Sequence, residues 1–151
     1  MRRLTYFVLI MAALYAGYWF VGARAVENGA RDAISDLAAQ GWNVGETQAD
    51  TRGFPSRFDT TFSDVDLSAP FGDFRYQTDF VQAFALSYRP NRVIVAFAPE
   101  QSFLFPGVTL RINTDGLKAS AGVSANTDLT FADFTAEAQS VALSTDIGLD
   151  G

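Results

Sequence analysis

The sequence predicts a mainly β protein, in which an N-terminal transmembrane helix and a stalk helix precede an antiparallel β-meander that forms an open, curled sheet. Three observations predict this fold class. Residues 4–23 carry no charge, the apolar period falls from about 3.6 to about 2 residues after Gly41, and turn residues separate the later runs. We expect a transmembrane anchor (1–25), a helical stalk (26–41) and a β-rich periplasmic domain (42–151) that is incomplete at its C-terminus.

The uncharged run from Leu4 to Ala23 predicts a membrane-spanning helix. At about 1.5 Å per residue it would span about 30 Å, the thickness of a hydrocarbon core. Arg2 and Arg3 precede it, so the positive-inside rule predicts a single-pass protein of a bacterial inner membrane, with a cytoplasmic N-terminus and a periplasmic C-terminal domain. The alternative is a signal peptide cleaved after Ala25, because Ala23-Arg24-Ala25 resembles a cleavage site.

Helical spacing continues beyond the apolar run, although charged residues now appear. Val26, Ala30, Ile34 and Leu37 recur at three- and four-residue intervals. Gly41 is a residue that commonly ends a helix. The segment 26–41 is therefore interpreted as a stalk that leaves the membrane.

Composition excludes several classes of function. From Val26 onward the chain has eight basic and seventeen acidic residues, so nucleic acid is not expected as a partner. The absence of cysteine and histidine removes thiol chemistry, histidine-based catalysis and most zinc sites. Asp59, Asp64, Asp66 and Asp73 match no calcium loop and are interpreted as the solvated face of strands. We expect no metal, no cofactor and no enzymatic activity.

The clearest strand is predicted at 74–88, where side chains alternate between two faces. The more apolar face contains the even-numbered residues Phe74, Tyr76, Thr78, Phe80, Gln82, Phe84, Leu86 and Tyr88. The turn residues at 89–91 should end this strand. Further strands are predicted at 57–68, 92–98, 108–114, 117–124 and 128–145. Asp115-Gly116 predicts a hairpin that makes 108–114 and 117–124 antiparallel neighbours.

Two groups of residues are singled out. Gly53, Phe54 and Pro55 should form a structural turn that sets the register of the next strand. The aromatic strand face would ordinarily be core. Its alternative use is an apolar groove for an acyl chain or a partner, for which the candidate residues are Phe80, Phe84, Leu86 and Tyr88.

Two stretches carry a family resemblance, namely GFPSRFD at 53–59 and FVQAFALSYRPNRVIV at 80–95. Together with Pro99-Glu100-Gln101 and the 112–120 segment, they resemble the bacterial domain of unknown function 2125. The resemblance implies an N-terminal membrane segment and a β-rich exported region, and it transfers no catalytic residue. Members of that family are typically about twice this length, so the chain is similar to the N-terminal part. The turn and long strands also loosely resemble AsmA-type envelope proteins, which are associated with lipid traffic.

Three functions remain open on the sequence. The first is a non-enzymatic envelope protein, either a scaffold or a lipid-binding module held at the membrane. The second is a periplasmic hydrolase that uses paired carboxylates. The third is a protein–protein interaction domain that pairs through an open sheet edge.

Overall fold

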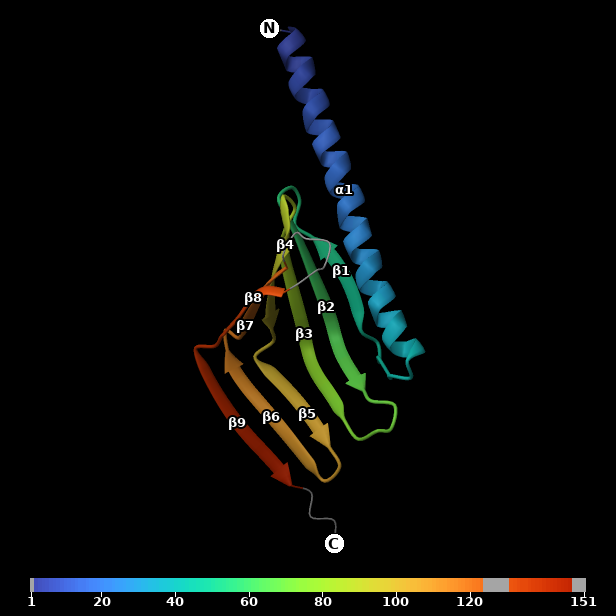
Figure 1. Ribbon diagram of the computed structural model, residues 1–151, viewed down its shortest axis with the longest axis vertical. Helices are drawn as coiled ribbons and strands as arrows, with labels where there is room; N and C mark the ends of the chain where they lie inside the picture. The colour runs from blue at the N-terminus through green and yellow to red at the C-terminus, as the bar shows by residue number, and fades with distance from the viewer. Residues whose placement is uncertain (1, 124–130, 148–151) are drawn as a thin grey trace.

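The computed structural model describes residues 2–123 and 131–147. Helix α1 (Arg2–Ala39) precedes one antiparallel sheet that is not closed, so the protein is mainly β (Figure 1). The strands are β1 (Gln48–Arg52), β2 (Arg57–Ser68), β3 (Arg75–Leu86), β4 (Arg89–Phe97), β5 (Glu100–Phe105), β6 (Val108–Asp115), β7 (Lys118–Val123), β8 (Phe131–Glu137) and β9 (Ser140–Ile147). β1 and β5 were not expected from the sequence.

Helix α1 is unbroken through both the predicted anchor and the predicted stalk. No proline interrupts it, and it ends where Gly41 takes a left-handed φ of 90°. The helix is long and apolar enough to cross a membrane. Its N-terminal half stands clear of the sheet, and its C-terminal half runs beside β1 (Figure 1).

The helix is fixed to the sheet by a small aromatic cluster. Trp19, Ala23 and Phe58 are buried together, and the Trp19 ring stacks on Phe58 with centroids 6.0 Å apart. The Trp19 indole N–H also donates to the Arg57 carbonyl at 2.9 Å. The helix and the start of β2 are therefore joined by both packing and a hydrogen bond.

The sheet is a meander of long strands, three of which are interrupted at the same level. β2 pairs with β3 over its whole length, while β4 and β5 share the other edge of β3. β7 and β6 follow along β4 and β5, and β8 and β9 come next. The interruptions at 98–99, 116–117 and 138–139 lie side by side, because Thr114 N–H donates to Pro99 O and Gln139 N–H donates to Asp115 O. We call this line the crease.

The predicted hairpin at Asp115-Gly116 is wrong. β6 pairs with β5 and β9, whereas β7 pairs with β4 and β8, so the two are not neighbours. A type I′ turn needs positive φ at both central residues, but here only Gly116 of the pair has it, at 65°. The glycine instead lets the chain cross the crease.

The turn predicted at 89–91 lies earlier. The chain reverses at Ser87 and Tyr88, and β4 already begins at Arg89. The register shifts between Ala85 and Leu86, so the β3–β4 ladder contains a bulge. The bulge accommodates the extra residues that the sequence suggested would form the turn.

The sheet is curved, and the residues of β3 that face its concave side are odd-numbered in one part of the strand and even-numbered in the other. This corrects the prediction of a single even-numbered face over 74–88. Phe97 and Phe103 line the same hollow, and their direct partners on β3 are Val81 and Tyr76. Directly opposite residues share a face. Odd-numbered residues of β3 therefore face the concave side near the helix, and even-numbered residues do so beyond the crease.

On β2 the same change occurs at Asp64. Phe58 and Thr60 are buried before it, and Val65 is buried after it. Asp64 has a φ of 52°, which breaks the regular alternation of the strand. One continuous concave face results, although no single strand shows an unbroken period of two.

Candidate functional site

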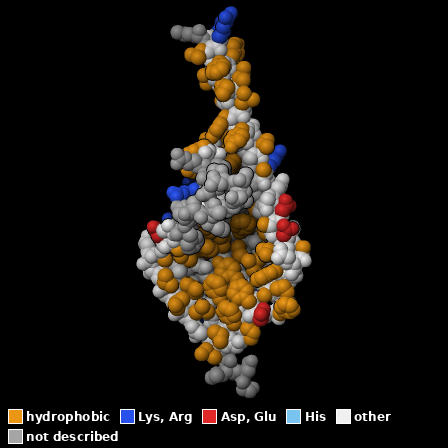
Figure 2. Space-filling view, viewed as in Figure 1, with side chains coloured by type: hydrophobic (Ala, Val, Ile, Leu, Met, Phe, Trp, Pro, Cys, Tyr) orange, Lys and Arg blue, Asp and Glu red, His pale blue; other side chains and the backbone are white. Residues whose placement is uncertain are grey.

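The concave face holds an apolar hollow of about 500 Å³ that we call the apolar trough. Its ring contacts are close, with centroids 4.9 Å apart for Tyr76 and Phe103 and 5.5 Å apart for Phe74 and Phe105. The lining residues are Leu37, Trp42, Leu67, Phe74, Tyr76, Phe97, Gln101 and Phe103. Figure 2 shows apolar side chains gathered in a hollow in the lower half of the molecule.

The trough continues across β6 and β9 to the edge of the sheet. Phe103 lies opposite Leu110, and Ile112 lies opposite Leu143. On β9, Leu143 is 65% exposed and Ile147 is 67% exposed. Isolated exposed apolar residues are ordinary, but a contiguous patch in a hollow indicates a binding surface.

The floor of the trough contains a polar group without a partner. Gln101 is 6% exposed, and its Oε1 accepts a hydrogen bond from the Tyr76 hydroxyl at 3.1 Å. Among the residues that the structure describes, Gln101 Nε2 and the nearby Thr114 Oγ1 have no partner. A buried donor left unpaired costs about 1–3 kcal/mol. Because this amide nitrogen is closed off from solvent, its missing hydrogen bond is a local cost of the packing beneath the trough.

Burial at this site also affects Tyr76. Desolvation raises the pKa of the Tyr76 phenol, and a hydrogen bond with Thr78 partly opposes this effect. The phenol is therefore protonated at neutral pH and remains a hydrogen-bond donor. It holds Gln101 in place and offers no base.

A second hollow, of about 520 Å³, lies on the side of the sheet opposite the concave face, which we call the outer face, between the crease and the hairpin ends beside the helix. We call it the basic hollow. Phe84 lies opposite Ile94, and Arg57 lies opposite Leu86. Three cations rim these apolar side chains; the lining residues are Arg57, Phe84, Ala85, Leu86, Arg92, Ile94 and Lys118. Arg57 also forms an ion pair with Asp59 at 3.1 Å.

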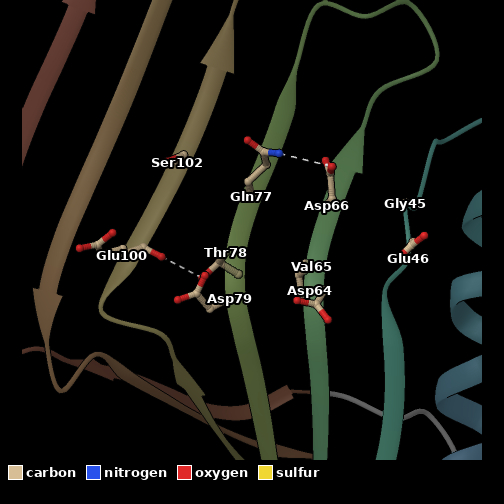
Figure 3. Close-up of a pocket in the computed structure, with 10 residues that line it drawn as sticks. All are labelled: Gly45, Glu46, Asp64, Val65, Asp66, Gln77, Thr78, Asp79, Glu100 and Ser102. Carbon is tan, nitrogen blue, oxygen red and sulfur yellow. Dashed lines mark hydrogen bonds between the residues drawn. The ribbon is translucent and has the colours of Figure 1, made fainter.

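A third hollow, of about 450 Å³, is acidic and lies on the outer face of the distal half, by which we mean the part of the sheet beyond the crease that contains β5, β6 and β9. Its carboxylates come from separate segments, namely the loop before β1, β2, β3 and β5 (Figure 3). Asp66 accepts from Arg75 Nε at 2.8 Å and from Gln77 Nε2 at 3.3 Å. The hydrogen bond from Arg75 is the main reason that the pKa of Asp66 is lowered. A general acid needs the opposite shift.

Metal binding has no support in the acidic hollow. Across residues 2–123 and 131–147, no group of three or more acidic side chains is placed to hold a metal ion. The nearby Thr78 hydroxyl donates to the Glu100 carbonyl at 2.9 Å, so part of the polar lining serves the β3–β5 contact (Figure 3).

The residues predicted for an apolar groove are divided by the structure. Phe84 and Leu86 line the basic hollow. Phe80 lies opposite Ser63 and is half-buried, and Tyr88 is exposed in the β3–β4 turn. The trough instead uses β5, which was not expected from the sequence, and extends over β6, which corresponds to the predicted strand 108–114. The alternation of Gln101, Phe103 and Phe105 is the signal that could have located it.

Gly53, Phe54 and Pro55 form the connection between β1 and β2. Arg57 N–H donates to Gly53 O at 3.0 Å, and Gly53 has a φ of 111°. A Cβ at this position would lie 2.9 Å from Arg57 O, so a side chain would also collide with the backbone. The Phe54 ring stacks on Phe20 and meets the edge of Trp19.

Comparison with known proteins gives one match. The model of a family described as an uncharacterized protein conserved in bacteria, DUF2125, matches residues 19–150. The chain belongs to this family. No curated protein and no solved structure shows significant similarity to the chain. Membership in domain of unknown function 2125 agrees with the resemblance in the sequence, whereas the looser likeness to AsmA-type proteins stays a prediction.

Proposed function

We propose that this member of domain of unknown function 2125 is a non-enzymatic, membrane-anchored lipid-binding module on the periplasmic side of a bacterial inner membrane. Helix α1 anchors it, and the apolar trough holds an acyl chain. The observation that carries the proposal is the continuous apolar concave face, which is hollowed and open toward β9.

The lining of the trough supports an acyl ligand. The trough is lined by aromatic and aliphatic side chains, which favour hydrocarbon by the hydrophobic effect. Such a pocket, mostly apolar with few polar groups, is typical of small-molecule sites.

Photo-crosslinking tests this function on the full chain. A phospholipid with a photoreactive group in its acyl chain is incorporated with the protein into nanodiscs, and crosslinked peptides are mapped by mass spectrometry. We expect adducts on 101–112 and 141–147, which line and extend the trough. Adducts confined to residues 2–23 would overturn the proposal, because they would report only lipid around the helix.

A matched pair of variants on β9 sharpens the test. Leu143 faces the trough, whereas Ser144 lies opposite Arg111 on the other face, and both are exposed. Leu143→Asp should reduce the trough adducts at least about fivefold, because a carboxylate is poorly tolerated against hydrocarbon. Ser144→Asp should leave them unchanged. Equal effects of the two variants, or capture of a polypeptide instead of lipid, would contradict acyl-chain binding.

A further inference from the structure

The free part of helix α1 is too short to cross a bilayer alone. Every residue from Arg2 to Leu14 is exposed, and contact with the sheet begins at Tyr15, whose hydroxyl donates to the Pro55 carbonyl at 2.9 Å. Its uncharged part, residues 4–14, rises about 16 Å, whereas a hydrocarbon core is about 30 Å thick. If the uncharged run 4–23 lies in the bilayer, about 14 Å of the sheet, beside residues 15–23 of the helix, must lie at the depth of the outer leaflet.

The two hairpin ends at this depth have apolar surfaces. The Tyr18 hydroxyl donates to the Ser87 carbonyl at 3.2 Å, so the β3–β4 turn lies beside the same part of the helix as the β1–β2 turn. Phe54 is 54% exposed and Tyr88 is 67% exposed. Exposed aromatic side chains at the ends of hairpins are costly in water and favourable at a membrane interface.

Positive charge gathers where this apolar surface ends. Arg57 follows the β1–β2 turn, and with Arg92 and Lys118 it rims the basic hollow. Arg24 lies about 7.5 Å farther along the helix axis than Trp19, by the rise of five residues. This concentration stands out because the exported part of the chain is strongly acidic. Arg and Lys side chains at such a boundary reach the lipid phosphates.

We propose that the β1–β2 and β3–β4 hairpin ends are inserted into the outer leaflet, and that the basic hollow binds the phosphate of an anionic phospholipid of the same bilayer. Apolar segments of interfacial proteins are buried about 5–10 Å at this boundary, which is of the same order as the missing helix length of about 14 Å. The proposal rests on the proposed membrane anchoring, and it does not require a lipid in the trough.

Depth measurements test the insertion. Because the chain has no cysteine, Phe54→Cys, Tyr88→Cys and Phe71→Cys each provide a single labelling site. Phe71 is 92% exposed in the β2–β3 loop, at the end of the sheet far from the N-terminal half of α1 (Figure 1). In nanodiscs of phosphatidylethanolamine and phosphatidylglycerol, a polarity-sensitive fluorophore at 54 or 88 should be protected from iodide and quenched by brominated acyl chains. The label at 71 should show the reverse.

Equal access of iodide to all three labels would overturn the insertion. A trough variant, Leu143→Asp, should leave the depths at 54 and 88 unchanged. In the wild-type protein, absence of trough adducts together with normal depths at 54 and 88 would therefore count against the trough alone. Exposed labels at 54 and 88 with normal trough adducts would count against insertion alone.

Native mass spectrometry of the full chain in mild detergent tests the headgroup site. The wild-type protein should retain phosphatidylglycerol about tenfold better than phosphatidylcholine, and Arg57→Gln/Lys118→Gln should remove that preference. The control is Arg111→Gln, which removes an exposed cation that pairs with Asp146 in the distal half. An unchanged preference in the double variant, or an equal loss in the control, would overturn the site.

Discussion

Asp64 shows how the backbone of a single residue shapes the concave face of the sheet. Its φ of 52° lies in the left-handed region, which Asp and Asn tolerate better than most side chains. The burial pattern of β2 changes parity across it, so Val65 rather than its neighbours faces the concave side. The sequence offered Asp64 only as one of several alternating acids, because backbone conformation at a single position leaves little trace in a periodicity.

Asp66, two residues later, stabilises the outer face of the same strands. Arg75 lowers its pKa mainly through a hydrogen bond, so the ionised form favours the folded state. The stabilisation is complete above the unfolded pKa of about 3.9 and is lost as pH falls through the lower folded pKa. Acid therefore weakens this contact.

We predict that Asp66→Asn lowers the free energy of unfolding at pH 7 by about 0.5–1 kcal/mol, because the pair is only partly shielded from solvent. As the pH falls below about 4, the difference between the variant and the wild-type protein should shrink, and it should vanish below the lowered folded pKa of Asp66. Urea titrations at several pH values measure this. Asp50→Asn, which breaks a more exposed pair with Arg52, should cost less. A constant difference down to pH 2 would contradict the interpretation.

At the scale of elements, the contact between helix α1 and the sheet depends on a small residue. A Cβ at Gly22 would lie 2.8 Å from the ring of Phe58, whereas the space around Gly29 is open. Phe58 is buried and stacked on Trp19, so its ring cannot easily move. Gly22 therefore permits the close approach that positions the hairpin ends against the helix.

We predict opposite effects for two identical substitutions in this helix. Gly22→Ala should destabilise the helix–sheet contact by about 1–3 kcal/mol through overpacking. Gly29→Ala should be neutral or stabilising by up to about 1 kcal/mol, because alanine favours a helix. Hydrogen exchange of the backbone amides in β1 and β2 measures the contact. Faster exchange in both variants, or in neither, would show that the packing at Phe58 is unimportant.

The sequence predicted those strands along which apolar and polar residues alternate over most of the strand in the structure. β2 coincides with the predicted 57–68, and β3 lies within 74–88. β1 is short and mostly polar, and β5 is bounded by Pro99 and Pro106, so neither gave a strong pattern. The trough was missed because its residues come from strands that become neighbours only through the crease. Periodicity identifies faces of single strands, and pairing across the sheet decides which faces combine.

At the scale of the whole molecule, two surfaces of opposite character share one sheet. The concave face is apolar along its length, while the outer face is basic near the helix and acidic beyond the crease. The separation of basic and acidic regions on the outer face would orient the protein if the helix lies in a membrane with anionic phosphates. The basic hollow would then face the lipid surface, and the acidic distal half would be repelled from it. The charge distribution and the helix therefore favour the same orientation.

The charges at the N-terminus predict how the helix is oriented in the membrane. Arg2 and Arg3 precede the uncharged run, so the N-terminus should remain in the cytoplasm and the sheet should be exported. Alkaline phosphatase fused after residue 151 should be active, and a fluorescent protein that matures only in the cytoplasm should stay dark there. Replacing Arg2 and Arg3 by Glu should weaken or invert this pattern, whereas Arg111→Glu, far from the apolar run, should not. A mature protein that begins at Val26 and washes free of membranes would establish a cleaved signal instead. Trp19 and Ala23 would then be lost from the cluster around Phe58, and the sheet would lose the contact that fixes its hairpin ends at the bilayer.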